Sequence, residues 1–130
     1  EGKKPEVGIV ACGPLVYEAL RAGKKLDDDG IETIVVNNHT IKPMDEGTIL
    51  KVARLTGAIV TVEEHQINGG MGSAVAEILS KRFPVPIEYI GMPDSFGESG
   101  EPNELLEKYG MKARHIIEAA KRAITRKLQS

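Results

Sequence analysis

AIVTVEEHQINGGMGSAVAEIL, residues 58 to 79, is the stretch that decides the fold of this chain. It opens with an apolar run rich in β-branched residues, Ala58 to Val62, which meets two carboxylates and then His65. This pattern predicts a buried strand that ends in a polar rim. A turn-prone loop follows from Gln66 to Gly72, and the helical spacing of the apolar residues after Ser73 predicts a helix.

The glycines of this stretch therefore lie at a helix start, where backbone N–H groups are unpaired and the helix dipole is positive. Because glycine has no side chain, an anion, a carboxylate or another backbone can come close. Two hypotheses stay open: the amides of Gly72 and Ser73 bind a phosphate or a partner's carboxylate, or the loop packs closely against another domain. We favour the second. The candidate anion-binding or domain-interface residues are Glu64, His65, Gly69, Gly70, Gly72 and Ser73.

Working outward from this stretch, the chain alternates strands and helices. Apolar runs predict strands at Val7 to Ala11, Thr33 to Val36 and Ile87 to Met92. Asp45 is the expected N-cap of the helix that Gly57 ends. Strands that are apolar on both faces predict an α/β fold of three layers (α/β/α), with a mainly parallel sheet of four strands in the order 2-1-3-4. At 130 residues, the expected organisation is a single domain, residues 1–130.

Two more helices are expected after the fourth strand. Pro102 opens a short one that Gly110 ends, and a last one uses apolar residues from Ile116 to Leu128. Four apolar side chains in or beside the loops are expected to mark a partner surface, because such side chains commonly lie at contact surfaces: Met71, Met92, Phe96 and Met111.

Composition narrows the classes of partner. A formal net charge of −2 gives no electrostatic reason to expect nucleic acid or an anionic membrane. No apolar run reaches the roughly 20 residues of a membrane span. The single cysteine, Cys12, excludes an internal disulfide and suits a reducing compartment, so we expect a cytoplasmic protein.

Polar side chains that could take part in catalysis or bind a metal follow the predicted strands, at the edge where open parallel sheets bind ligands. A nucleophile pair would form if Cys12 met His39 or His65. A zinc site from His39, His65 and Glu64 would have suitable ligand types. A cysteine that ends a buried strand is more often a core residue, however, and the zinc candidates lack any tight ligand spacing. We therefore predict no catalytic residue and no metal site.

Nucleotide-binding motifs are missing from the sequence. The first strand-helix turn has only Gly13, and Val75 stands where the later glycine pair would need a third glycine, so a dinucleotide site is not expected. No P-loop sequence occurs. The run Asp27 to Asp29 follows a helix rather than a strand, and we interpret it as a solvated turn.

Four segments carry a family resemblance. VVNNHTIKPMD at 35 to 45, VTVEEH at 60 to 65, GGMGSAV at 69 to 75 and GMPDSFGESGEPNELLEKYGM at 91 to 111 resemble, in this order, the C-terminal domain of transketolase and its thiamine-diphosphate relatives. The resemblance implies one more strand, antiparallel, before the first. Only EGKKPE precedes Val7, so we expect that strand to be cut off or to be formed by residues outside this chain.

The resemblance also implies a function. It implies an accessory domain that assists assembly and dimerisation of a transketolase of the pentose phosphate pathway, which transfers two-carbon ketol units between sugar phosphates. Thiamine diphosphate and a divalent metal (Mg or Ca) are implied for the complete enzyme, with the remaining domains or subunit as partners. Asp28-Asp29-Gly30 with Asn37-Asn38 resembles the diphosphate-binding signature of thiamine enzymes, but its first residue and its spacing are both wrong. This chain alone is therefore expected to be inactive.

Alternatives stay open within and outside the family. VTVEE and the glycine segment are at least as close to deoxyxylulose-phosphate synthase, whereas FGESG at 96 to 100 and ELLEKYG at 104 to 110 favour transketolase. The β subunits of 2-oxoacid dehydrogenases match these segments less well. A free-standing regulatory module that binds an anion at the Gly69 to Ser73 helix start is a hypothesis of another class.

Overall fold

The computed structural model describes residues 4–38, 45–66, 70–92, 107 and 110–129, with the backbone alone at 64–66 and 92. The elements follow one another as β1 (Val7–Ala11), a short 3-10 helix (Gly13–Leu15), α1 (Val16–Asp28), β2 (Thr33–Asn37), α2 (Glu46–Thr56), β3 (Ile59–Gln66), α3 (Met71–Arg82), β4 (Ile87–Met92) and α5 (Ala113–Gln129).

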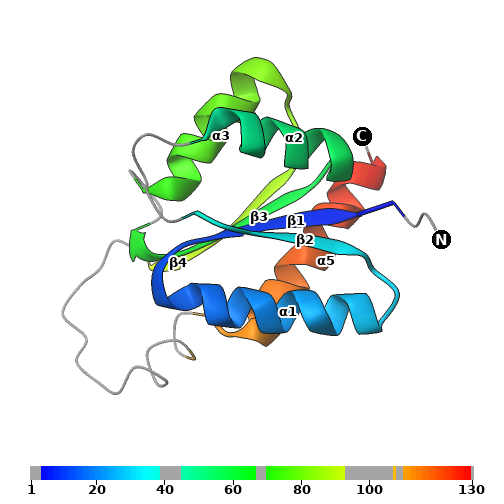
Figure 1. Ribbon diagram of the computed structural model, residues 1–130, viewed down its shortest axis with the longest axis vertical. Coiled ribbons are helices and arrows are strands. Elements are labelled where there is room, and N and C mark those ends of the chain that lie inside the picture. Colours follow the sequence, from blue (N-terminus) through cyan, green and yellow to red (C-terminus); the bar gives the residue numbers. More distant parts are fainter. Residues whose placement is uncertain (1–3, 39–44, 67–69, 93–106, 108–109, 130) are drawn as a thin grey trace.

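The four strands pair in parallel in the order β2-β1-β3-β4, which confirms the predicted fold class. Helices α2 and α3 cover one face of the sheet, and α1 and α5 cover the other (Figure 1). The chain thus has three layers. The order reverses between β1 and β3, so the carboxyl ends of these two strands are where a fold of this kind places ligands.

Alternate residues of each inner strand contribute to two cores. Val7, Ile9 and Ala11 of β1 face α1 and α5, whereas Val10 faces α2 and α3 together with Cys12, which follows the strand. All five residues of β1 are buried, as expected for a strand covered by helices on both sides. Each core fixes the register of the strands, because a slip of one residue would exchange the two faces.

Helix ends follow the predicted capping residues. The Asp45 carboxylate accepts a hydrogen bond from the Thr48 amide at 3.2 Å and another from the Thr48 hydroxyl at 2.7 Å. Gly57 ends α2 in the left-handed conformation, with φ of 75°. Both predictions are confirmed.

Two expectations on the central and last helices need correction. Helix α3 begins at Met71, two residues before the expected start, because the first amides of the helix find an acceptor in the side chain of Glu63. In α5, Leu128 is 76% exposed, so it does not take part in the core. Instead, Ala119 and Ala123 line the buried face of α5 with Ile116 and Ala120, and these small residues let the helix approach the sheet closely.

The remaining expectations lie outside the described residues or near their limits. The described residues before β1, Lys4 to Glu6, do not form the implied antiparallel strand, and residues 1–3 are not described. Of the short helix expected from Pro102 to Gly110, only Glu107 and Gly110 are described.

The hydrogen bonds at Asp45 predict a pH dependence. The Thr48 hydroxyl and amide hold the pKa of Asp45 below its ordinary value. Since this pKa is lower in the folded state, the contribution of Asp45 to stability is present above its unfolded pKa and is lost as pH falls through the folded pKa. In urea titrations, the wild type should exceed Asp45→Asn in midpoint at about pH 6, and this difference should shrink by about pH 3. A difference that stays constant would contradict this role.

Gly8 predicts a steric limit in β1. A Cβ at Gly8 would collide with Cγ1 of Val52 and lie 3.1 Å from Cδ1 of Ile59, so Gly8→Ala should lower the free energy of unfolding by about 1–3 kcal/mol. Gly47→Ala is the matched control, because a Cβ at this exposed helix position meets only Asp45, at 3.4 Å. It should raise stability by up to about 1 kcal/mol. Equal effects of the two variants in denaturant titrations would contradict the packing argument.

Candidate functional site

The carboxyl ends of β1, β2 and β3 bring the predicted polar segments to one edge. The amide of Cys12 donates to the Val62 carbonyl at 3.2 Å, and the amide of Asn38 donates to the Ala11 carbonyl at 2.8 Å. Cys12 and Asn38, which follow β1 and β2, therefore lie at the same edge as Val62 of β3. His39 and residues 93–95 lie outside the described residues, as do the side chains of Glu64 and His65.

Glu63 lies at the centre of this edge and is 2% exposed. Its Oε1 accepts a hydrogen bond from the amide of Met71, and its Oε2 accepts one from the amide of Gly72, both at 2.7 Å. These are the first two residues of α3, where unpaired amides and the positive end of the helix dipole favour a negative group. The anion at this helix start is thus a carboxylate of the chain itself.

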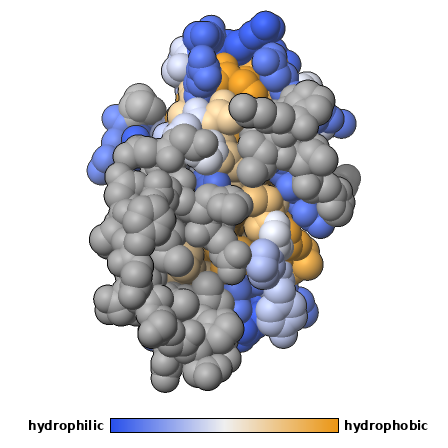
Figure 2. Space-filling model, turned by 90° about the vertical axis from the view of Figure 1, so that its left-hand side faces the viewer, coloured by the Kyte–Doolittle hydropathy of each residue, from blue (hydrophilic) through white to orange (hydrophobic). Residues whose placement is uncertain are grey.

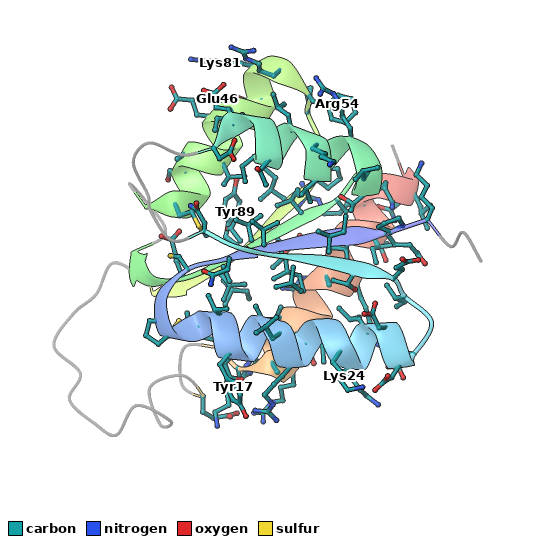
Figure 3. The ribbon with its side chains drawn as sticks, viewed as in Figure 1. Tyr17, Lys24, Glu46, Arg54, Lys81 and Tyr89 are labelled. Atoms are coloured by element: carbon teal, nitrogen blue, oxygen red, sulfur yellow. The ribbon has the colours of Figure 1, made fainter. Side chains whose placement is uncertain are left out.

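Gly72 is required by the same arrangement. A Cβ at this position would lie 2.9 Å from Oγ1 of Thr61, 3.0 Å from Cδ1 of Tyr89 and 3.2 Å from Oε2 of Glu63. The side chain of Tyr89 extends from β4 into the layer between the sheet and α3 (Figure 3). The missing side chain therefore allows the helix start to pack on β3 and β4.

This geometry bears on the two hypotheses for the glycine segment. The amide of Gly72 already donates a short hydrogen bond within the chain, and a single N–H has little capacity for a second acceptor. The other candidates stay predictions, and we carry them forward as interface residues: Glu64, His65, Gly69, Gly70 and Ser73.

Two other chemical groups of the edge are described, and both are buried. Cys12 is 8% exposed and belongs to the core under α2 and α3, which agrees with its interpretation as a core residue. The Nδ2 atom of Asn38 is buried and has no acceptor among the residues that the structure describes. Within the described ranges, no three histidine, cysteine or acidic side chains come together as metal ligands.

The predicted partner surface is wrong for two of its residues. Met71 is 0% exposed and Met111 is 1% exposed, because both belong to the cores. Met92 and Phe96 have side chains outside the described residues. The large apolar side chains that do reach the surface include Tyr17 and Leu20 on α1, and Tyr17 points away from the sheet (Figure 3).

The structural roles of Glu18, His115 and Glu63 were not predicted from the sequence. Glu18 is 7% exposed, and its Oε1 accepts a hydrogen bond from the Ala113 amide at 2.9 Å, so it caps the start of α5 from a distance of 95 residues. His115 accepts a hydrogen bond from the Lys112 amide through Nδ1 at 3.1 Å. An acidic residue eight positions before the start of α3 was the available signal for Glu63. Nothing in the sequence connects Glu18 with Ala113.

The close contacts of Gly72 predict a large effect of a small substitution. Gly72→Ala should lower the free energy of unfolding by about 1–3 kcal/mol, because the helix start must move away from Thr61, Tyr89 and Glu63. The control is Glu77→Ala on the exposed side of the same helix, which should change stability by less than about 0.5 kcal/mol. Denaturant titrations measure both, and a neutral Gly72→Ala would show that the contacts are loose.

Comparisons with known proteins agree with the fold. The family model "Transketolase, C-terminal domain" matches residues 1–116. A 6-deoxy-6-sulfo-D-fructose transketolase subunit, SqwH, of Clostridium sp. (strain MSTE9) is 45% identical over 122 residues, which are 94% of this chain and 38% of that protein. A 1-deoxy-D-xylulose-5-phosphate synthase of Desulforudis audaxviator (strain MP104C) is 40% identical over 117 residues, 88% of this chain and 18% of that protein.

A solved structure of a transketolase has a similar fold. A split-gene transketolase, described as an inactive beta4 tetramer, has a TM-score of 0.89 and 47% sequence identity, and the match covers 95% of this chain and 40% of that one. The chain thus spans two fifths or less of the length of these three proteins. In the described part of the chain, no helix is both long enough and apolar enough to cross a bilayer. On its sequence and its fold, this chain belongs to the transketolase C-terminal domain family.

Proposed function

We propose that this chain is the C-terminal part of a transketolase, which transfers two-carbon ketol units between sugar phosphates in the pentose phosphate pathway of the cytoplasm. The observation that carries the proposal is the family match over residues 1–116. Residues 1–130 then form one domain, which is supported by the packing of both cores on a single sheet.

The role that we propose for the domain is assembly rather than chemistry. Among the described side chains of the carboxyl edge, two that could react have structural roles: Glu63 caps α3, and Cys12 lies in the core. Among the described residues visible on the face that contains this edge, pale to orange ones lie in the middle and hydrophilic ones lie at either end of the molecule (Figure 2). Such a surface suits contact with another domain better than binding of a sugar phosphate.

The interface proposed for this role includes the candidate residues that follow Glu63, from Glu64 to Ser73. Buried partner surfaces are typically depleted of charge at their centre and polar at the rim, which fits a mixture of glycines with a few polar side chains. The partners are the remaining domains or subunit of the enzyme, and we propose that the complete enzyme is a homodimer.

Thiamine diphosphate and the divalent metal, Mg or Ca, do not fit the described residues of this chain. A diphosphate would need unpaired amides or basic side chains, and the first two amides of α3 already bind Glu63. A metal would need a group of oxygen or nitrogen ligands, and none of three or more occurs in the described ranges. We therefore assign cofactor binding to the rest of the enzyme.

A second candidate is the C-terminal domain of a 1-deoxy-D-xylulose-5-phosphate synthase. It is favoured by a specific observation: one such enzyme is 40% identical to this chain over 117 residues. The two candidates share the fold and differ in the product. Detection of 1-deoxy-D-xylulose 5-phosphate rather than ketol exchange between sugar phosphates would favour the second.

The proposal predicts activity for the whole enzyme and none for this chain. With thiamine diphosphate and Mg²⁺, the complete enzyme should exchange two-carbon units between a ketose phosphate and an aldose phosphate, with products identified by mass spectrometry. The 130-residue chain alone should form no product and should give no saturable heat when thiamine diphosphate is titrated into it. Tight cofactor binding by the isolated chain, or turnover by it, would contradict the proposal.

A further inference from the structure

The start of α5 has a histidine where a capping box usually has a glutamate or a glutamine. The Lys112 carbonyl accepts hydrogen bonds from the amides of His115 and Ile116, at 2.9 and 3.1 Å, so Lys112 is the N-cap residue of this helix. In return, the Lys112 amide donates to Nδ1 of His115 at 3.1 Å. His115 is the third residue of α5, and its imidazole therefore has the role of the third-position acceptor in a capping box.

This acceptor depends on the protonation state of the ring. A neutral imidazole has one nitrogen that accepts and one that carries a proton, whereas both nitrogens of an imidazolium are donors. The hydrogen bond from the Lys112 amide requires an unprotonated Nδ1, so Nε2 carries the proton. Histidine is the side chain that ordinarily changes its charge between about pH 5 and 8. We infer that His115 makes the start of α5 a pH-sensitive contact, which is closed while the imidazole is neutral and is opened by its protonation.

The other side chains that could cap this helix start cannot replace the imidazole. The side chain of Lys112 has only donors. Glu18 of α1 is already engaged, because its Oε1 accepts from the amide of Ala113 at 2.9 Å and lies 3.7 Å from Nη1 of Arg21. A carboxylate or an amide at position 115 would accept from the Lys112 amide without a change in this pH range. The histidine thus adds a pH dependence that the usual residues of a capping box do not have.

The charges around the helix start decide what protonation does. Charged side chains come here from α1, from the segment before α5 and from α5 itself: Glu18, Arg21, Glu107, Lys112, Arg114 and Glu118. Glu18 forms an ion pair with Arg21, and Glu107 forms one with Arg114. Glu118, one turn after His115, would attract an imidazolium weakly, because Glu118 is exposed. The positive end of the helix dipole and the lost hydrogen bond act in the opposite direction, and together they favour opening.

The contact lies beside the core. Met111 and Ile116, on either side of the capped turn, are 1% and 0% exposed and pack between the sheet, α1 and α5. The ring of His115 also lies close to Gly110, where a Cβ would be 3.7 Å from its Cδ2. Since α5 begins at the carboxyl edge of the strands, protonation of His115 loosens the core at that edge of the sheet (Figure 1).

The experiment measures solvent exchange of the Lys112 amide by NMR in the 130-residue chain, as the wild type and as His115→Gln. Glutamine accepts from the same amide and does not titrate. Between about pH 7.5 and about pH 5.5, protection corrected for the intrinsic effect of pH should fall about fivefold or more in the wild type. In His115→Gln it should change by less than about twofold. His115→Asn, which also offers an amide oxygen, serves where His115→Gln does not fold.

The nitrogen NMR signals of the imidazole give a second measurement. At about pH 7.5 they should show His115 as the neutral ring with its proton on Nε2. A proton on Nδ1 would overturn the inference, because that nitrogen could not then accept from Lys112. Equal pH dependence of the Lys112 amide in the wild type and the variant would overturn it as well. His39 and His65 are present in both proteins, so their titration cancels in the comparison.

Discussion

Two short hydrogen bonds from the start of α3 to one buried carboxylate decide how the edge of this sheet is built. Glu63 accepts from Met71 and Gly72, and it does so from the central strand pair at which the strand order reverses. In folds of this class the same location often holds a ligand phosphate on a helix N-terminus. Here a side chain supplies the negative group, so the favourable electrostatics of the helix start stabilise the chain rather than a bound anion.

A second buried carboxylate caps a helix start on the other face of the sheet. Glu18 of α1 caps α5, as Glu63 of β3 caps α3, and both helices begin at the carboxyl edge of the strands. In each case a carboxylate connects two elements that the local sequence does not connect. Hydrogen bonds from amides to a charged acceptor are among the stronger ones, about 1.5–3 kcal/mol each, and this offsets the cost of burial. Glu63 and Glu18 therefore have structural roles.

Periodicity and capping residues predicted the fold, but not the contacts of the site. The limits of β1 and β4, the cap at Asp45 and the strand order were all confirmed, because each depends on local pattern and on topological rules. Met71 was predicted to be exposed and is buried, since the helix begins two residues earlier than expected. Its position depends on Glu63, eight residues away, and long-range acceptors of this kind cannot be deduced from spacing.

The glycines of the central stretch show why a motif can identify a family and still mislead about a site. Gly72 is needed because Thr61, Tyr89 and Glu63 occupy the volume that a side chain would fill. Its requirement is thus explained within the chain. Two relatives named for different reactions, a 6-deoxy-6-sulfo-D-fructose transketolase subunit and a 1-deoxy-D-xylulose-5-phosphate synthase, match this chain at 45% and 40% identity. Because proteins named for different reactions match this chain almost equally well, its sequence indicates the family and carries little information about the substrate.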